Sequence, residues 1–381
     1  MLSPVDEIEL AEIVAGASTP LAIHGGGTRP IGRNVDGEPI TTARISGITL
    51  YEPGSLTVSA RAGTSLAEIN AALEAEGQML AFEPMDHRRL LGTEGTPTIG
   101  GIVAANVSGP RRVQAGACRD YLLGIRFVDG VGTVIKNGGR VMKNVTGYDL
   151  TKLMAGSRGT FGILSEVSFK VLPRPETIAV LHLAGLSVSS AVAAMSLALK
   201  SPFEVSGAAH VPVGPDGHPV TMLRVEGFET SVVYRSEKLR DLLAPFGAAD
   251  IECRLGNDGS YGTKSGWQWV RDAEIFANTS DDVWRISVKP SDAPRLVEHL
   301  GDARLLLDWG GGLIWAGIAS GTDVRATMKG IGGHATLIRA SEETKTQVGV
   351  FPRENKTLAA LSEGLRQKFD PKAILNPGLM N

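Results

Sequence analysis

The chain has 381 residues, with 38 Lys and Arg against 41 Asp and Glu and a formal net charge of −3 at pH 7. This length predicts two domains, and the near-balance of charge excludes a strongly basic nucleic-acid-binding surface or a polybasic membrane tether. The two cysteines, Cys118 and Cys253, argue against a disulfide framework and are fewer than the roughly four ligands of an iron–sulfur cluster.

The first 175 residues combine short apolar strands with few helices. A helix is predicted over 3–16, with Ser3 as its N-cap and Pro4 in its first turn. Ser65 and Glu68 have the spacing of a capping box, which predicts a second helix. The remaining predicted segments are strands over 20–23 and 56–63, a hairpin over 121–136 with its turn at 129–130, and a strand within 159–175 that ends at prolines.

A different pattern begins at residue 176. The order strand, helix, strand, strand, helix, strand is typical of a ferredoxin-like α+β module, and we expect this domain to cover 176–340. Residues 341–381 contain a helix ending near Phe369 and are expected to return to the first domain, 1–175. No internal repeat is evident. The elements are a strand at 181–185, a helix near 189–199, a strand–turn–strand around 214–219, a helix near 231–244, and strands at 284–290 and 311–318.

Glycine is abundant, at 47 of 381 residues, and the glycines cluster in loops between apolar strands. Three successive glycines at 25–27 can turn their backbone N–H groups inward as an anion nest, a geometry that binds pyrophosphate. Thr28 adds a hydroxyl donor and Arg29 a positive charge. A plain glycine-rich turn is the alternative. Pro30 stands where a G-x-G-x-x-G fingerprint needs glycine, and no P-loop signature occurs, which disfavours a NAD or ATP site.

Two further loops repeat this chemistry. The second runs from Pro97 to Gly101 and continues to Gly109, and its paired glycines let a flat ring lie against the main chain. We expect a helix start or a tight loop there rather than a core helix. The third covers 156–163, directly before the last strand of the domain. Each loop alone could be a turn, but three in this order predict a cofactor-binding domain.

The order of these loops carries a resemblance to a known superfamily. The segments GGGT (25–28), TIGGIVAAN (98–106) and GSRGTFGI (156–163) are similar to those of the vanillyl-alcohol-oxidase, or PCMH-type, FAD-binding domain. The later motifs SGPRR, WRISVKPSDAP, LLLDWGGGLIW and GGHAT resemble the FAD-binding subunits of bacterial glycolate oxidases, over essentially the whole chain. The implied fold is α+β, with a two-subdomain PCMH-type FAD-binding domain and a smaller ferredoxin-like α+β domain.

The resemblance also implies cofactor-binding residues. The first loop would hold the FAD pyrophosphate, the second would line the middle of the cofactor, the third would contact it through the backbone, and Asn376 would lie near the flavin. His24 could attach the flavin covalently. We favour the alternative, in which His24 only ends the strand and FAD binds non-covalently. Lys143 and Tyr148 would lie near the cofactor without an assigned role. The implied FAD-binding residues are His24, Gly25, Gly26, Gly27, Thr28, Arg29, Gly32, Pro97, Thr98, Ile99, Gly100, Gly101, Asn106, Ser108, Gly109, Gly159, Gly162, Ile163 and Asn376.

Catalytic and metal-binding residues are harder to predict. Arg285 and Arg339 could clamp a substrate carboxylate or form structural ion pairs, and His334 is a weak candidate for a base. Related 2-hydroxyacid dehydrogenases carry an H-x-G-D-G-N-x-H metal motif that this sequence lacks, and His210 and His218 fit a hairpin better. We therefore expect no metal site. Five tryptophans are predicted as core or interface anchors: Trp267, Trp269, Trp284, Trp309 and Trp315.

The function implied by the resemblance is that of a glycolate oxidase (glycolate dehydrogenase) subunit. Such a complex oxidises glycolate, a small 2-hydroxy acid, to glyoxylate and contains a larger flavoprotein subunit and an iron–sulfur subunit that receives electrons. The alternatives are an FAD electron-relay or assembly subunit without its own substrate site, and a stand-alone dehydrogenase of the D-lactate type. The acidic N-terminus does not resemble a secretory signal, and no apolar run approaches a membrane span. We expect a cytoplasmic protein, at most peripheral at the inner face of the cell membrane through partners, with no nucleic-acid partner.

Overall fold

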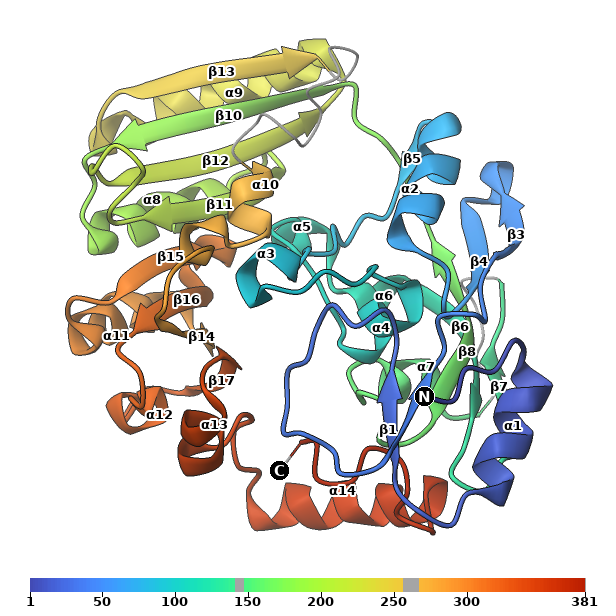
Figure 1. Cartoon of the computed structure of the whole chain (residues 1–381). Helices are drawn as coiled ribbons and strands as arrows, with labels where there is room; N and C mark the ends of the chain where they lie inside the picture. The colour runs from blue at the N-terminus through green and yellow to red at the C-terminus, as the bar shows by residue number, and fades with distance from the viewer. Residues whose placement is uncertain (141–146, 256–266, 381) are drawn as a thin grey trace. The chain divides into compact units, whose positions relative to one another are not determined.

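The computed structural model describes residues 1–140, 147–255 and 267–380, which form two compact units (Figure 1). Unit 1 comprises Met1–Ser108, Ala117–Pro173 and Arg353–Asn381, and unit 2 comprises Gly109–Gly116 and Arg174–Pro352. Both units combine helices with mainly antiparallel sheets, as predicted for an α+β protein.

The described residues of unit 1 form three separate sheets. The largest is antiparallel, in the order β3-β4-β8-β6-β7, a second pairs β1 with β2 in parallel, and a third pairs β5 with β9 antiparallel. The C-terminal segment returns to the β1–β2 sheet, because the Leu21 N–H donates to the Ile374 carbonyl at 2.7 Å. The elements are α1 (Glu7–Gly16), β1 (Leu21–His24), β2 (Glu38–Thr41), β3 (Ile48–Glu52), β4 (Thr57–Arg61), α2 (Leu66–Ala75), β5 (Gln78–Met79), α3 (Arg88–Leu91), α4 (Ile99–Ala104), α6 (Cys118–Tyr121), β6 (Leu122–Val128), β7 (Val134–Gly138), α7 (Leu150–Met154), β8 (Ile163–Lys170), β9 (Leu172–Pro173) and α14 (Lys356–Phe369).

The local sequence signals in unit 1 have different outcomes. The first helix begins at Glu7 rather than near Ser3, because the Asp6 carboxylate accepts hydrogen bonds from the Ile8 and Glu9 N–H groups and caps it. The cap at Ser65 is confirmed, since its hydroxyl accepts from the Glu68 N–H at 3.1 Å. The hairpin is confirmed by the antiparallel pairing of β6 with β7.

Unit 2 is built on one eight-stranded antiparallel sheet in the order β13-β10-β12-β11-β15-β16-β14-β17. Its helices pack their apolar residues against one face, where Leu223, Trp284 and Ile314 belong to a single buried core. Figure 1 shows α8 and α9 along the first four strands. The elements are α5 (Arg112–Ala115), β10 (Thr177–Ala184), α8 (Val188–Lys200), β11 (Val205–Val211), β12 (Val220–Gly227), α9 (Glu229–Leu243), β13 (Ala249–Leu255), α10 (Trp267–Arg271), β14 (Asp282–Val288), α11 (Ala293–Leu300), β15 (Arg304–Asp308), β16 (Leu313–Ile318), α12 (Val324–Thr327), β17 (Gly333–Arg339) and α13 (Glu342–Val348).

The sheet of unit 2 consists of two copies of the same strand–helix–strand–strand–helix–strand module. In the first, β10 to β13 with α8 and α9 have the spatial order fourth, first, third, second. In the second, β14 to β17 with α11 and α12 have the same order read from the other edge. The predicted ferredoxin-like module is therefore present twice, and the expectation of no internal repeat is wrong at the level of structure. The strand at 284–290, expected to close the first module, instead opens the second.

The unit boundaries differ from the domain ranges expected from the sequence. The contacts of 109–116 group this segment with unit 2, because Arg111 forms a buried ion pair with Glu226 on β12. Residues 341–352 also belong to unit 2, so the part that returns to unit 1 starts at Arg353 rather than at 341.

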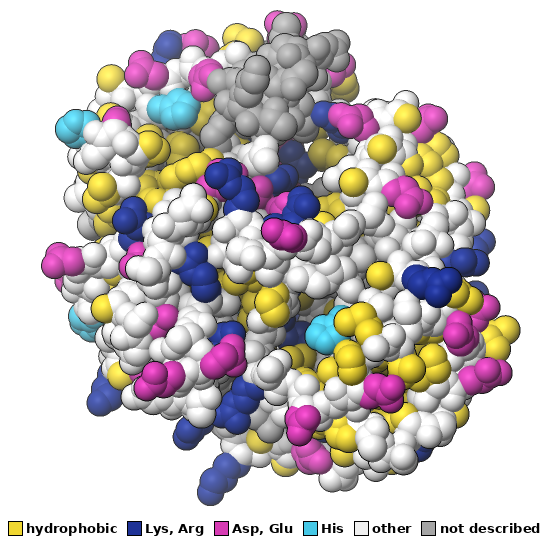
Figure 2. All heavy atoms as spheres, in the orientation of Figure 1, with side chains coloured by type: hydrophobic (Ala, Val, Ile, Leu, Met, Phe, Trp, Pro, Cys, Tyr) yellow, Lys and Arg dark blue, Asp and Glu magenta, His cyan; other side chains and the backbone are white. Residues whose placement is uncertain are grey.

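Two general surface features accompany this fold. Basic and acidic side chains are interspersed over the face drawn in Figure 2, in keeping with the balanced composition. Across the described ranges, no helix combines the length and the apolar character needed to cross a membrane.

Candidate functional site

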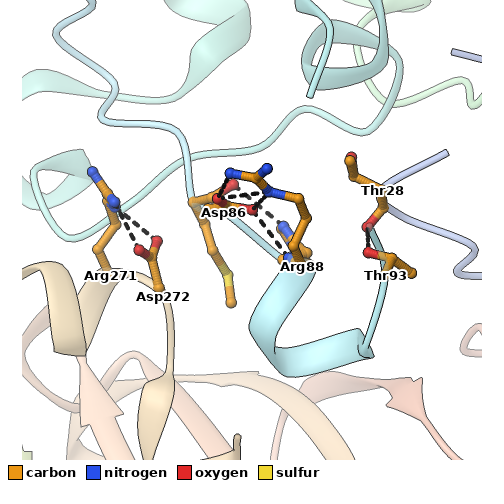
Figure 3. A network of polar contacts seen from close by, with 8 residues as sticks. Thr28, Asp86, Arg88, Thr93, Arg271 and Asp272 are labelled. Atoms are coloured by element: carbon orange, nitrogen blue, oxygen red, sulfur yellow. Dashed lines mark hydrogen bonds and ion pairs between the residues drawn. The ribbon is translucent and has the colours of Figure 1, made fainter. Parts of the chain in front are cut away.

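The first two glycine loops of unit 1 are packed tightly together. A Cβ atom on Gly26 would lie 1.6 Å from the Thr96 carbonyl oxygen, and one on Gly95 would lie 1.9 Å from the Gly26 carbonyl oxygen. The Thr93 hydroxyl also donates to the Thr28 carbonyl at 3.1 Å (Figure 3). The three-glycine loop is therefore held in place by 93–98, and only glycine fits at 26.

The same loop has the properties of an anion nest. The backbone N–H groups of Gly26, Gly27 and Thr28 make no hydrogen bond within the described part of the chain. Gly27 has φ +73° and nothing within 4 Å of its Cβ position, so its neighbourhood is open. Three neighbouring free N–H groups in a left-handed turn are suited to phosphate oxygens.

Arg29 supplies positive charge beside this nest. Burial lowers the pKa of Arg29 to about 10, while Asp86 and Cys118 act in the opposite direction. The group therefore stays protonated at neutral pH, yet its guanidinium forms no hydrogen bond or ion pair with any described residue. Asp86 is bound by Arg88 through three hydrogen bonds (Figure 3). A half-buried cation without a partner among the described residues, next to free N–H groups, fits a pyrophosphate.

The second loop forms the short helix α4, as the prediction of a helix start allowed. The expectation that it would not be a core helix is wrong, because Ile99, Ile102 and Val103 are fully buried. Thr98 caps it, with its hydroxyl accepting from the Gly101 N–H at 3.4 Å. A Cβ on Gly100 would lie 2.6 Å from that of Ala62, so this glycine lets α4 approach the end of β4. A Cβ on Gly101 would lie 3.8 Å from Arg29 Nη2, which places the guanidinium at the start of α4.

The third loop is bound to the end of α4. The Arg158 N–H donates to the Ala104 carbonyl at 2.8 Å, and the Gly156 N–H donates to the Val103 carbonyl at 3.0 Å. Arg158 adopts φ +53°. Gly162 lies against Phe127, because its Cβ position is 2.5 Å from that ring.

Asn376 joins the first and third loops. Its side-chain oxygen accepts from the Ile23 N–H at 2.7 Å, and its amide nitrogen donates to the Arg158 carbonyl at 2.8 Å. Only 3% of Asn376 is exposed. The predicted C-terminal asparagine thus lies at the loops, and its side chain acts there as a bridge between two backbone segments.

The remaining predicted FAD-binding residues have mixed surroundings. The side-chain oxygen of Asn106 accepts a hydrogen bond from the Arg119 N–H, and the Ser108 hydroxyl accepts one from the Cys118 N–H. Gly109 belongs to unit 2. His24 is exposed at the end of β1, Gly25 lies beside Thr98, and Gly32 lies against Leu379. Pro97 and Ile99 form backbone hydrogen bonds with residues at and just before the start of α2, Gly159 lies beside Asn376, and Ile163 belongs to an apolar core. Tyr148 is 89% exposed, and Lys143 lies outside the described residues.

Unit 2 carries a second polar cluster, around Arg285. Arg285 on β14 pairs with Thr336 on β17, so His334, two residues from Thr336, projects from the same face. This face is opposite to the one that α8, α9, α11 and α12 cover, because Trp284 and Ile286 point into that core. The sequence candidates Arg285 and His334 therefore lie together.

Two further residues complete this cluster. The guanidinium carbons of Arg112 and Arg285 lie 4.7 and 5.0 Å from the centroid of the Trp309 ring. Burial, the largest cause, and Arg112 lower the pKa of Arg285 to about 10, against the opposing effect of Asp308. His334 is exposed at the start of β17, and desolvation followed by the charges of Arg285 and Arg112 lowers its pKa, which favours the neutral imidazole.

Arg339 lies apart from the cluster. Its guanidinium donates to the Phe276 and Asp281 carbonyls and to the Thr279 hydroxyl, at 2.7 to 3.3 Å. Oxygen atoms of the 276–281 segment surround the Arg339 guanidinium, so the contacts of this side chain are structural. Arg271 and Asp272, also drawn in Figure 3, form a separate pair in unit 2.

The histidines weighed as metal ligands have ordinary surroundings. His210 is buried in β11, with Nδ1 2.9 Å from the Thr221 hydroxyl, and His218 is exposed in the turn that follows. Burial lowers the pKa of His210 to about 4. The described residues contain no cluster of three His, Cys, Asp or Glu side chains that could hold a metal.

Sequence reasoning did not assign Arg112 a role and treated Trp309 only as an anchor. The adjacent arginines at 111 and 112, in a segment of small residues, were the available signal. Their separate partners, Glu226 for Arg111 and the Trp309 ring for Arg112, come from distant strands and loops, so the sequence could not distinguish their roles.

Comparisons with known proteins agree with this architecture. Residues 1–138 match the family model described as FAD binding domain. The chain has a TM-score of 0.69 to a 4-ethylphenol oxidase from Gulosibacter chungangensis at 14% identity, covering 99% of this chain and 88% of that one. It has a TM-score of 0.67 to an alkyldihydroxyacetonephosphate synthase at 16% identity, covering 98% and 76%. These structures confirm the predicted fold class.

Curated relatives give the family. The chain is 30% identical to glycolate oxidase subunit GlcD of Bacillus subtilis over 46% of this chain and 37% of the relative. It is 34% identical to a D-lactate dehydrogenase of Anaerostipes hadrus over 43% and 32%. It is 36% identical to glycolate oxidase subunit GlcE of Escherichia coli over 95% of this chain and 93% of the relative. The chain therefore belongs to the family of the glycolate oxidase subunit GlcE, among the FAD-dependent hydroxyacid oxidoreductases.

Proposed function

We propose that this chain is the FAD-binding subunit of a glycolate oxidase complex that oxidises glycolate to glyoxylate. The observation that carries the proposal is the packing of the first two glycine loops around free backbone N–H groups at Gly26, Gly27 and Thr28, next to the guanidinium of Arg29, which has no partner among the described residues. A half-buried cation and an open nest are costly unless an anion binds there. The family relationship to GlcE makes the FAD pyrophosphate the fitting anion.

The residues of this chain would bind and orient the cofactor. FAD supplies the hydride acceptor when bound, and the protein positions it and adjusts its electrostatic surroundings. The nest and Arg29 would hold the pyrophosphate, and the bridge at Asn376 would keep the first and third loops at a fixed distance. We propose non-covalent binding, because His24 ends β1 as an exposed strand-end residue before the nest.

Electron transfer and assembly involve partner chains in this proposal. Two cysteines cannot ligate an iron–sulfur cluster, so electrons would leave through an iron–sulfur subunit. A larger flavoprotein subunit is the second partner, supported by the 30% identity to glycolate oxidase subunit GlcD over 46% of this chain. We place the complex in the cytoplasm or at the inner face of the cell membrane, attached through its partners.

The test is a visible spectrum of the purified chain, followed by anaerobic addition of glycolate. Flavin absorbance that bleaches with glycolate but not with acetate, which lacks the hydroxyl group, is the expected result. A folded chain that binds no FAD, alone or with its partners, would overturn the proposal.

An FAD relay subunit without a substrate site is the second candidate. It is favoured by the missing H-x-G-D-G-N-x-H motif. It predicts a flavin spectrum that glycolate does not bleach in the isolated chain but does bleach in the complex. A stand-alone D-lactate-type enzyme, the third reading, would instead show faster bleaching with D-lactate than with glycolate.

A further inference from the structure

We propose that unit 2 contains a binding site for one carboxylate group, formed by the guanidinium groups of Arg112 and Arg285 beside the ring of Trp309. The inference rests on the proposed function and deepens it, because it assigns this site to the carboxylate of the 2-hydroxy acid. It thereby places substrate recognition on this chain rather than on a partner.

The first argument is the lack of a partner for Arg285. Its guanidinium lies against the Trp309 ring but forms no hydrogen bond or ion pair with the described residues. A guanidinium group has five N–H donors in a planar fork, and leaving them unsatisfied in a half-buried position is costly. The matching acceptor is a planar carboxylate, which can take two parallel hydrogen bonds.

The second argument is the local charge balance. Beyond the effect of burial, Arg112 lowers and Asp308 raises the pKa of Arg285, so both charged groups lie near it. Arg112 and Arg285 bring two positive charges to the Trp309 ring, which favours an anionic ligand such as the carboxylate of a small 2-hydroxy acid.

The third argument is that both sides of the site are rigidly supported. The Trp309 indole N–H donates to the Gly109 carbonyl at 3.1 Å, which ties the ring to the segment that carries Arg112. The neighbouring Arg111 forms a buried ion pair with Glu226, whose side chain is 7% exposed. Because these contacts fix the backbone around Arg112, little conformational freedom remains to be lost when a ligand binds.

His334 adds a hydrogen-bond acceptor to the site. It lies on the face of the sheet that carries Arg285, and its neutral imidazole can accept a hydrogen bond. A hydroxyl group next to the bound carboxylate would have this acceptor available. The combination of two cations and one neutral acceptor suits a molecule with an anionic group beside a hydroxyl.

The experiment compares the wild type with Arg285→Gln, Arg285→Lys and Arg304→Gln in the FAD-loaded protein with its partners. Arg304 is an exposed arginine on β15 of the same sheet, so its substitution controls for the loss of one positive charge. Two readouts are needed. The first is saturation-transfer NMR with acetate, which binds as a carboxylate and is not oxidised. The second is anaerobic flavin bleaching by glycolate and by its uncharged amide.

We expect Arg285→Gln to abolish the acetate signal, to raise the half-saturating glycolate concentration about tenfold to a hundredfold, and to reduce the preference for glycolate over the amide. Arg285→Lys should restore part of the acetate signal and part of the preference, because it keeps the charge without the fork. Arg304→Gln should behave as the wild type. Flavin content and unfolding temperature, measured for each variant, show whether the protein stays folded.

The outcomes separate this inference from the proposed function. If glycolate bleaches the wild type and Arg285→Gln at the same concentrations with the same discrimination against the amide, the carboxylate site is overturned while the function stands. If glycolate fails to bleach the wild type but acetate binding depends on Arg285, the site stands and the proposed reaction falls.

Discussion

Gly26 and Thr96 approach so closely that a Cβ on Gly26 would lie 1.6 Å from the Thr96 carbonyl oxygen. The requirement for glycine at 26 thus comes from loop packing. Gly26→Ala should force the first two loops apart, destabilise unit 1 by about 1–3 kcal/mol, as overpacking does, and lower the flavin content. Thermal unfolding and the flavin-to-protein ratio check both effects. An unchanged unfolding temperature would contradict this packing.

Gly27 allows a test of the nest without this clash. Its φ is +73° and nothing lies within 4 Å of its Cβ position, and asparagine and aspartate tolerate such a backbone better than other residues. Gly27→Asp would place a negative charge beside the N–H groups, while Gly27→Asn has the same shape without the charge. We expect Gly27→Asp to retain several-fold less FAD than Gly27→Asn, at similar stability of the FAD-free proteins. Equal FAD retention would mean that no anion binds there.

Asn376→Ala removes the bridge between the Ile23 N–H and the Arg158 carbonyl. Each of the two backbone groups that loses this hydrogen bond costs about 1–3 kcal/mol, so we expect a loss of about 2–6 kcal/mol in the free energy of unfolding together with weaker FAD retention. The matched control is Asn355→Ala, which removes the exposed N-cap of α14 and should cost about 1 kcal/mol without affecting FAD. Urea unfolding and flavin release distinguish the two variants, and similar behaviour of both would refute the bridge.

His210 should make stability depend on pH. Its pKa falls from 6.5 to about 4 on folding, mainly through burial, so below pH 6.5 the unfolded chain binds a proton that the folded chain does not. Stability is therefore lost as the pH falls from 6.5 towards 4, by on the order of 3 kcal/mol in total. His210→Gln keeps a hydrogen-bonding group for Thr221 but cannot titrate. Between pH 7 and 5 it should lose about 2 kcal/mol less than the wild type, and parallel pH profiles would contradict this assignment.

The sequence predicted local interactions correctly where all the interacting atoms belong to one short segment of the chain. The N-cap at Ser65 and the 121–136 hairpin need only residues close in the chain, and both form as predicted. The first helix shows the limit of such reasoning, because Ser3 and Asp6 both suit an N-cap and only Asp6 has helical N–H groups in reach. The doubling of the module in unit 2 was hidden because its second copy shares strand order rather than recognisable sequence.

The sequence by itself determined the three glycine loops, the α+β class and the family relationship, because these depend on residue types in a fixed order along the chain. Tertiary structure alone decided which side chains share a site. Arg112 and Arg285 are separated by most of unit 2 in sequence, and the Trp309 ring brings them together. Arg285 and Arg339 lie on neighbouring strands of one sheet, yet one guanidinium is bound by backbone carbonyls and the other forms no hydrogen bond with a described residue. That difference arises from contacts between segments distant in sequence, and no property of the arginines themselves encodes it.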